Sequence, residues 1–115
     1  MREVKYGGKV RLDRRQALLY GILVIRSFKH RGLKRLYERD DRSGIRPDLL
    51  EKVEDILGRL DRATTVQALN LPGYRLHPLK GELRGVWSVT VRANWRITFR
   101  FEGEDAFGVE MIDYH

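Results

Sequence analysis

The chain contains no cysteine, which excludes disulfides, thiolate nucleophiles and cysteine-ligated metal sites. It also lacks any apolar run close to the ~20 residues that a transmembrane helix needs. The longest such stretch, Ala17–Ile25, has nine residues and is followed at once by Arg26 and Lys29. No small-residue cleavage site follows it, which argues against a signal peptide. We therefore expect a cytoplasmic protein with no membrane partner.

Several catalytic motifs are absent as well. The chain has no HExxH zinc motif, no Gly-x-Ser-x-Gly nucleophile elbow, no P-loop and no GxGxxG fingerprint. Its carboxylates are scattered rather than grouped at metal-ligand spacing. The signatures of RRM and KH domains are missing too, which disfavours a generic RNA-binding module. We expect no metal and no cofactor.

The charge balance favours a polyanionic partner. With 115 residues, 42% of them hydrophobic and 34% charged, the chain has the size and composition of one globular domain. Its net charge of +7 indicates nucleic acid before other partners. Residues 1–23 hold six basic and two acidic side chains, and residues 75–100 hold six basic side chains against Glu82 alone. We therefore expect the positive charge of the body to be concentrated in residues 75–100.

The first half of the body is predicted to be mainly helical. Leu23–Ile25 is a short β-favouring run near the expected start of the domain at Val24. Ser27 is a suitable N-cap for a first helix, which Gly32 weakens without forbidding. Pro47 suits the first turn of a second helix. The first helix is indicated by Leu33, Leu36 and Tyr37, and the second by Leu49, Leu50, Val53, Ile56, Leu57 and Leu60.

The second half is predicted to be a sheet. Alternating apolar and polar residues indicate strands over Trp87–Arg92 and Trp95–Phe101, joined by a turn at Ala93-Asn94. A last strand is expected over Ala106–Ile112, and an extra one at Leu76–Leu79 stays open. The order β-α-α-β-β-β predicts an α+β fold, with two antiparallel helices packed on a mostly antiparallel twisted sheet.

Basic residues alternate with the apolar ones in these strands. Because the apolar face must pack on the helices, Arg92, Arg96 and Arg100 are expected to share the opposite face. A solvated face is the ordinary interpretation of such a pattern. Ordinary solvated faces mix charges of both signs, however, and guanidinium groups match phosphate oxygens well. We therefore expect a phosphate-binding surface formed by Arg75, Arg84, Arg92, Arg96 and Arg100.

Proton-transfer groups lie near this basic segment. His77 and Lys80 flank Pro78 just before it, and the chain closes on Asp113, Tyr114 and His115. Taken singly, a histidine before proline is more often a packing residue, and a lysine is more often merely exposed. Together with the arginines they could cleave RNA, because attack by a ribose 2′-hydroxyl needs a base, an acid and cations. The candidates are His77, Asp113 and His115 for proton transfer, Lys80 and Arg96 as cations, and Tyr114 for stacking on a base or orienting the phosphate.

Four stretches together carry a family resemblance. SFKHRGLKRLYE, LHPLKG, NWRITF and the closing DYH resemble the HigB branch of the RelE toxin superfamily, over about residues 24–115. The resemblance implies a ribonuclease that enters the ribosomal A site and cuts the translated mRNA without a metal. It also implies a HigA-type helix-turn-helix antitoxin, which binds the toxin and operator DNA. The implied active-site residues are His77, Lys80, Arg96, Asp113, Tyr114 and His115.

Three points stay open at this stage. Residues 1–23 precede the family pattern and are basic, so they are either the product of a start assigned too early or an arm that grips ribosomal RNA. Arg92-Ala93 stands where relatives carry small or polar residues, so Arg92 is not inherited as catalytic. The alternative function is a RelE-like module without catalysis, which binds nucleic acid and acts as corepressor with its antitoxin.

Overall fold

The computed structural model describes residues 4–6, 9–11 and 25–114. In the amino-terminal part, β1 (Val4–Tyr6) and β2 (Lys9–Arg11) pair antiparallel and form a two-stranded sheet of their own. The sequence pattern did not predict these strands, although Gly7-Gly8 between them is a pair that favours a hairpin turn. The rest of the predicted extension and Val24 lie outside the described residues.

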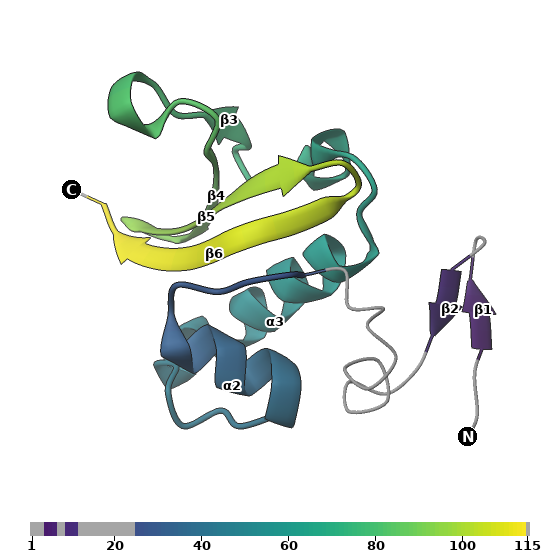
Figure 1. The fold of residues 1–115 in the computed structure, drawn as a ribbon. Helices are drawn as coiled ribbons and strands as arrows, with labels where there is room; N and C mark the ends of the chain where they lie inside the picture. Colours follow the sequence, from purple (N-terminus) through teal and green to yellow (C-terminus); the bar gives the residue numbers. More distant parts are fainter. Residues whose placement is uncertain (1–3, 7–8, 12–24, 115) are drawn as a thin grey trace.

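Both predicted helices are present and cover one face of the main sheet (Figure 1). They are α2 (Arg31–Arg39) and α3 (Pro47–Arg62), and Pro47 begins α3 as predicted, with Asp48 in its first turn. Short 3₁₀ helices follow at η1 (Val66–Leu69) and η2 (Gly81–Leu83). The buried face of α3 consists of Leu49, Val53, Ile56, Leu57 and Leu60. None of the helices in the described part of the chain has the length and apolar character needed to cross a bilayer.

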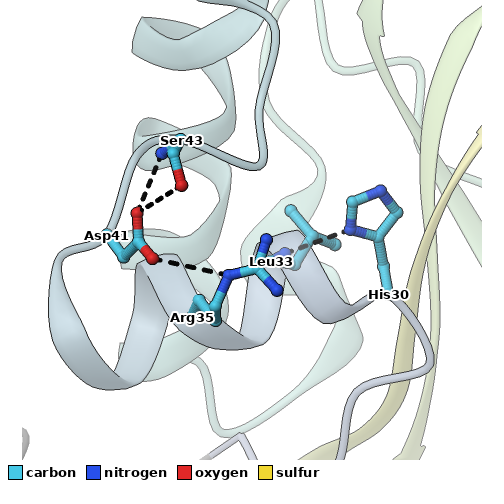
Figure 2. Close-up of polar contacts among 5 residues, drawn as sticks. All are labelled: His30, Leu33, Arg35, Asp41 and Ser43. Atoms are coloured by element: carbon cyan, nitrogen blue, oxygen red, sulfur yellow. Dashed lines mark hydrogen bonds and ion pairs between the residues drawn. The ribbon is translucent and has the colours of Figure 1, made fainter.

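The start of α2 differs from the prediction. His30, not Ser27, is the N-cap, because its Nδ1 accepts a hydrogen bond from the backbone N–H of Leu33 at 3.1 Å (Figure 2). Ser27 Oγ instead accepts a hydrogen bond from the backbone N–H of Gly108 at 2.8 Å, so the Ser27 side chain contacts the last strand of the sheet and does not cap the helix. Long-range pairing with the last strand therefore overrides the local preference of serine for a cap.

Of the strand predicted at Leu23–Ile25, only Ile25 lies among the described residues, and it forms one of two isolated bridges to the last strand. Ile25 pairs with Ala106 and Phe28 pairs with Val109, both in parallel orientation. The backbone N–H groups of Arg26 and Lys29 donate to Ala106 and Val109 at 2.8 Å each. This segment ties the chain before α2 to the edge of the sheet and buries Ile25 in the core.

The main sheet has the strand order β3-β4-β5-β6, and every neighbouring pair is antiparallel. The predicted α+β class is confirmed, as are the three long strands, each to within one residue at its ends. The strands are β3 (His77–Pro78), β4 (Trp87–Arg92), β5 (Trp95–Glu102) and β6 (Asp105–Asp113). Val89, Ile97, Phe99, Val109 and Met111 are buried on the helix-covered face.

Arg92 does not lie on the face predicted for it. The register of β4 against β5 shifts between Thr90 and Arg92, so Arg92 pairs with Trp95, whose side chain packs against the core. Its Nη1 lies 3.5 Å from the carboxylate of Asp48 at the start of α3. A bulge of this kind adds a residue to one strand and redirects the side chain beyond it. The prediction that Arg92, Arg96 and Arg100 share one face is therefore wrong for Arg92.

Gly32 has a packing role that helix propensity does not reveal. A Cβ at Gly32 would lie 2.6 Å from the carbonyl oxygen of Gly44 and 2.9 Å from His30 Cε1. The missing side chain thus lets α2 approach the loop before α3. Gly58 in α3 makes a matched contrast, because a Cβ there would meet only Arg62 Nη1, at 3.7 Å.

We predict opposite effects for the two Gly→Ala substitutions. Gly58→Ala should raise the free energy of unfolding by about 0.5–1 kcal/mol, since alanine favours the helix. Gly32→Ala should lower it by about 1–3 kcal/mol, because the added methyl group overlaps backbone atoms that cannot move easily. Urea denaturation of the full chain measures both changes. Equal stabilisation by the two substitutions would show that α2 does not need the close approach at Gly32.

Candidate functional site

The sheet face turned away from the helices carries polar side chains in short rows. Directly paired residues of neighbouring strands point to the same face, and successive rows on that face lie about 7 Å apart. Ser88 and Thr98, in the two middle strands, are only 2% and 8% exposed despite their hydroxyl groups. One row consists of His77, Ser88, Thr98 and Glu110, and the next consists of Thr90, Arg96 and Ile112. We call this surface the open face.

His77 lies exposed on the edge strand β3, and its imidazole has a defined orientation. Its Nδ1 is 3.0 Å from the carbonyl oxygen of Arg75. Because a carbonyl oxygen only accepts hydrogen bonds, Nδ1 must carry the hydrogen of this bond. Nε2 is then the nitrogen that can exchange a proton with a ligand.

The segment before His77 is held to both layers of the fold. The backbone N–H of Thr90 donates to the carbonyl oxygen of Tyr74 at 2.7 Å, which ties the segment to β4. The Tyr74 hydroxyl donates to the carboxylate of Asp55 in α3, and Lys52 Nζ lies 4.4 Å from the centre of the Tyr74 ring. Tyr74 is buried and therefore anchors the strand that presents His77.

Arg96 is half-buried in the row beside that of His77. Its Nη1 donates to the carbonyl oxygens of Ala93 at 2.7 Å and Trp95 at 3.4 Å. A guanidinium has five N–H donors, so donors remain for a ligand. Its cross-strand neighbour Thr90 has a buried Oγ1 with no hydrogen-bond partner among the described residues.

The end of β6 lies beside this arginine, as predicted, but its side chains divide between the two faces. Asp113 pairs with Trp95, so strand alternation directs it to the helix-covered face, where it is exposed at the end of the sheet. Tyr114 follows the end of β6 and is 50% exposed. Its backbone N–H donates to the carbonyl oxygen of Asn94 at 2.7 Å. His115, the last predicted site residue, lies outside the described residues.

The other predicted cations surround the loop between β3 and β4. Lys80 and Arg84 are exposed at the two ends of η2, and the loop is closed by a bond from Leu79 N–H to the Val86 carbonyl at 2.8 Å. Arg100 Nη1 lies 3.5 Å from the Arg84 carbonyl oxygen, beneath this loop. Within residues 25–114, no hydrogen bond or ion pair joins Lys80 to the side chains of His77 or Arg96. The site is therefore a spread surface rather than a closed cluster.

Two charged features were missed in the sequence. Glu110 is an acidic residue on the open face, beside Thr98, and its Oε1 accepts from the Met111 N–H at 3.2 Å. Strand alternation could have located it. Residues 26–46 hold eight basic and three acidic side chains, a net +5 that equals that of residues 75–100. The expectation that the positive charge is concentrated in one segment is therefore wrong. We call the exposed Arg31, Lys34 and Arg39 the α2 basic face.

The open face offers general acid–base and electrostatic chemistry. An imidazole with one assigned ring proton and a guanidinium held by backbone carbonyls lie in adjacent rows, about 12 Å apart by strand spacing. In the described part of the chain, His, Asp and Glu side chains do not form a group of three that could hold a metal ion.

The chain is similar to a protein-family model, to a named protein and to a solved structure. A family model described as "RelE-like toxin of type II toxin-antitoxin system HigB" matches residues 26–115. The protein named Endoribonuclease HigB from Proteus vulgaris is 49% identical over 92 residues, which span 80% of this chain and 100% of that protein. A solved structure, the YoeB/ParE toxin from Agrobacterium tumefaciens, matches with a TM-score of 0.42 and 25% identity, over 59% of this chain and 75% of that one.

The anchor at Tyr74 gives a prediction about alkaline stability. Burial of its hydroxyl, together with its bond to the Asp55 carboxylate, raises the pKa of Tyr74 to about 12. The unfolded value is about 10, so the folded state favours the neutral phenol. This stabilisation is complete below pH ~10 and is lost as the pH rises through about 12.

Urea denaturation between pH 9 and pH 12 measures the effect. The free energy of unfolding of the native chain should fall more steeply with pH than that of Tyr74→Phe, which has no hydroxyl to ionise. Deprotonation of lysines and of the other tyrosines affects both chains alike. The same slope in both proteins would contradict the shift assigned to Tyr74.

Proposed function

Because the chain belongs to the HigB family of RelE-like toxins from type II toxin–antitoxin systems, we propose that it cleaves mRNA on the ribosome. In this proposal it is an endoribonuclease that cuts the message in the A site and so stops translation. The observation that carries the proposal is the placement of His77 and Arg96 in adjacent rows of one basic face. Their types and positions suit acid–base chemistry at a phosphodiester.

The proposed reaction is an attack by the ribose 2′-oxygen on the adjacent phosphorus. A base takes the 2′-hydroxyl proton, the bond from phosphorus to the 5′-oxygen breaks, and an acid protonates that oxygen. The products are a 2′,3′-cyclic phosphate and a free 5′-hydroxyl. His77 Nε2 can accept or donate one of these protons, and His115 is the proposed partner for the other. Asp113, which strand alternation directs to the helix-covered face, is assigned no proton transfer.

Cations stabilise the charge that develops on phosphorus. Arg96 lies in the same row as Thr90, and its guanidinium is held by backbone carbonyl oxygens. Its remaining N–H groups can therefore bind a phosphate oxygen without a large loss of side-chain entropy. Lys80 adds a second positive charge from the β3–β4 loop. Tyr114 is an exposed aromatic ring at the end of the face and can stack on a base. Arg75, Arg84 and Arg100 are proposed to bind flanking phosphates.

The ribosome is the proposed site of action because the chain carries basic residues on two sides. The open face takes the mRNA, and the α2 basic face is available for 16S ribosomal RNA. Figure 1 shows α2 and the β3–β4 loop on opposite sides of the sheet, so the two contacts do not compete. Since both are phosphate contacts, binding is expected to weaken as salt increases. Action on ribosomes also places the protein in the cytoplasm.

We infer the regulatory partners from the family to which the chain belongs, not from a binding surface of the structure. A toxin of this family implies an antitoxin. We propose that it is a HigA-type helix-turn-helix protein and that the complex binds operator DNA. Residues 24–115 are proposed as the toxin domain and residues 1–23 as an extension to it.

Arg96 and Arg92 provide a matched pair for testing the site. Both arginines belong to the β4–β5 hairpin, but Arg96 is on the open face and Arg92 is beside Asp48. We predict that Arg96→Ala lowers the rate of mRNA cleavage by about 10²–10³-fold, as expected for loss of a transition-state donor. Arg92→Ala, with the same loss of charge, should stay within about threefold of the native rate.

The assay is a translation reaction with purified ribosomes, followed by mapping of the cleaved mRNA. The native chain should cut the message only when ribosomes are present. Equal losses for Arg96→Ala and Arg92→Ala would contradict the assignment of the open face. Intact mRNA at high concentrations of the native protein would instead favour the alternative function, a corepressor without catalysis.

A further inference from the structure

Three residues other than glycine have a left-handed backbone within the described ranges. They are Asp40, Arg75 and Ala93, with φ angles of 56°, 51° and 51°. Asp40 ends α2 in this conformation, which is a common way to close a helix. The other two belong to no helix end, and arginine and alanine rarely adopt positive φ. The two-residue hairpin turn requires a positive φ at Ala93, whereas Arg75 belongs to no turn or helix end.

Both of these residues direct a carbonyl oxygen at a candidate active-site side chain. The Arg75 oxygen is 3.0 Å from His77 Nδ1, two residues further along the chain. The Ala93 oxygen is 2.7 Å from Arg96 Nη1, three residues further along. A change of φ and ψ to the extended or right-handed region would rotate each carbonyl group and break its bond. The left-handed conformation is thus what makes these two contacts geometrically available.

The chain on either side holds these conformations in place. Next to Arg75, the Tyr74 carbonyl accepts the Thr90 N–H at 2.7 Å. Next to Ala93, the Asn94 carbonyl accepts the Tyr114 N–H, also at 2.7 Å. Strained backbone persists only where its surroundings impose it, and it gathers at functional sites.

Side-chain contacts do not explain the strain. The Arg75 side chain is exposed and makes no hydrogen bond or ion pair with any residue in the described ranges. Ala93 occupies the first position of a two-residue hairpin turn, where positive φ usually selects glycine. In both cases the carbonyl group is the part of the residue that contacts the site.

We propose that Arg75 and Ala93 are positioning residues, whose left-handed backbones fix the His77 tautomer and the Arg96 guanidinium through their carbonyl oxygens. The catalytic consequence rests on the proposed ribonuclease function, whereas the geometric one does not. The Arg75 carbonyl keeps the proton on His77 Nδ1 and leaves Nε2 for the reaction. The Ala93 carbonyl restricts Arg96 to one orientation before RNA binds, so less freedom is lost on binding.

Substitutions at the two positions separate the backbone conformation from the side chain. Glycine accepts positive φ without strain, alanine accepts it poorly, and β-branched valine disfavours it most. The test uses the full chain with Arg75→Gly, Arg75→Ala and Arg75→Val, which all lose the same charge. Ala93→Gly and Ala93→Val form the second set. Circular dichroism and thermal unfolding identify the variants that fold, and the Arg75→Gly and Arg75→Ala pair is informative even if valine prevents folding.

Nitrogen-15 NMR of the His77 ring, assigned with His77→Gln, reads the tautomer without any catalysis. In the native chain and Arg75→Gly, neutral His77 should carry its proton on Nδ1. In Arg75→Ala and Arg75→Val, the Nε2–H tautomer should become populated in that order. In the ribosome assay, Arg75→Val should cleave at least tenfold more slowly than Arg75→Gly, and Ala93→Val at least tenfold more slowly than Ala93→Gly.

The two readouts distinguish the possible failures. An unchanged tautomer in every Arg75 variant, with equal cleavage rates for valine and glycine at both positions, would overturn the positioning role. A tautomer that follows the predicted order while even the native chain leaves mRNA intact would support the positioning geometry and overturn the ribonuclease proposal.

Discussion

The two-residue turn at Ala93-Asn94 is the constraint on which the rest of the site depends. It pairs Arg92 with Trp95, and together with the bulge between Thr90 and Arg92 it sets the register of the two central strands. With this register Ile97 and Phe99 are buried against the helices, and Arg96 lies on the open face. A slip of one residue would exchange the two faces, exposing the core residues and burying the arginine. The Asn94 carbonyl also receives the Tyr114 N–H, so the same turn locates the carboxyl-terminal end.

The two faces of the sheet have different roles: one carries the apolar core and the other carries the candidate site. The helix-covered face holds the apolar core, and α3 extends a polar contact from that layer to the strand of His77 through Asp55 and Tyr74. The open face has buried hydroxyl groups at its centre and cations around them, and these cations suit a polyanionic ligand. The α2 basic face adds positive charge on the other side. The two basic surfaces lie on opposite sides of the sheet, so the proposed contacts with the message and with the ribosome do not compete.

Features with a strong local pattern were predictable from the sequence. The two helices followed from apolar periodicity and Pro47, and the three long strands followed from strict alternation around the Ala93-Asn94 turn. The family motifs also identified the candidate site residues, and the structure brings His77 and Arg96 to the same face. In each case neighbouring residues in the sequence carried the information.

Features that depend on contacts between distant segments were not predictable. Ser27 has the residue type of an N-cap, but its pairing with Gly108 leaves that role to His30. Alternation placed Arg92 beside Arg96, and a bulge moved it toward Asp48 instead. In the last strand, Ile112 pairs with Arg96 and Asp113 pairs with Trp95, so Asp113 and Arg96 lie on opposite faces of the sheet. The left-handed backbone of Arg75 has no sequence signal, whereas the turn predicted at Ala93-Asn94 implies a positive φ at Ala93.

The end groups of the RNA fragments test the 2′-hydroxyl mechanism most directly. Message cleaved by the native protein on ribosomes is isolated, and the ends at the cut are identified by mass spectrometry. Acid–base catalysis by the open face predicts a 2′,3′-cyclic phosphate on the upstream fragment and a 5′-hydroxyl on the downstream one. A 5′-phosphate on the downstream fragment would contradict it, because that product requires attack by water rather than by the ribose.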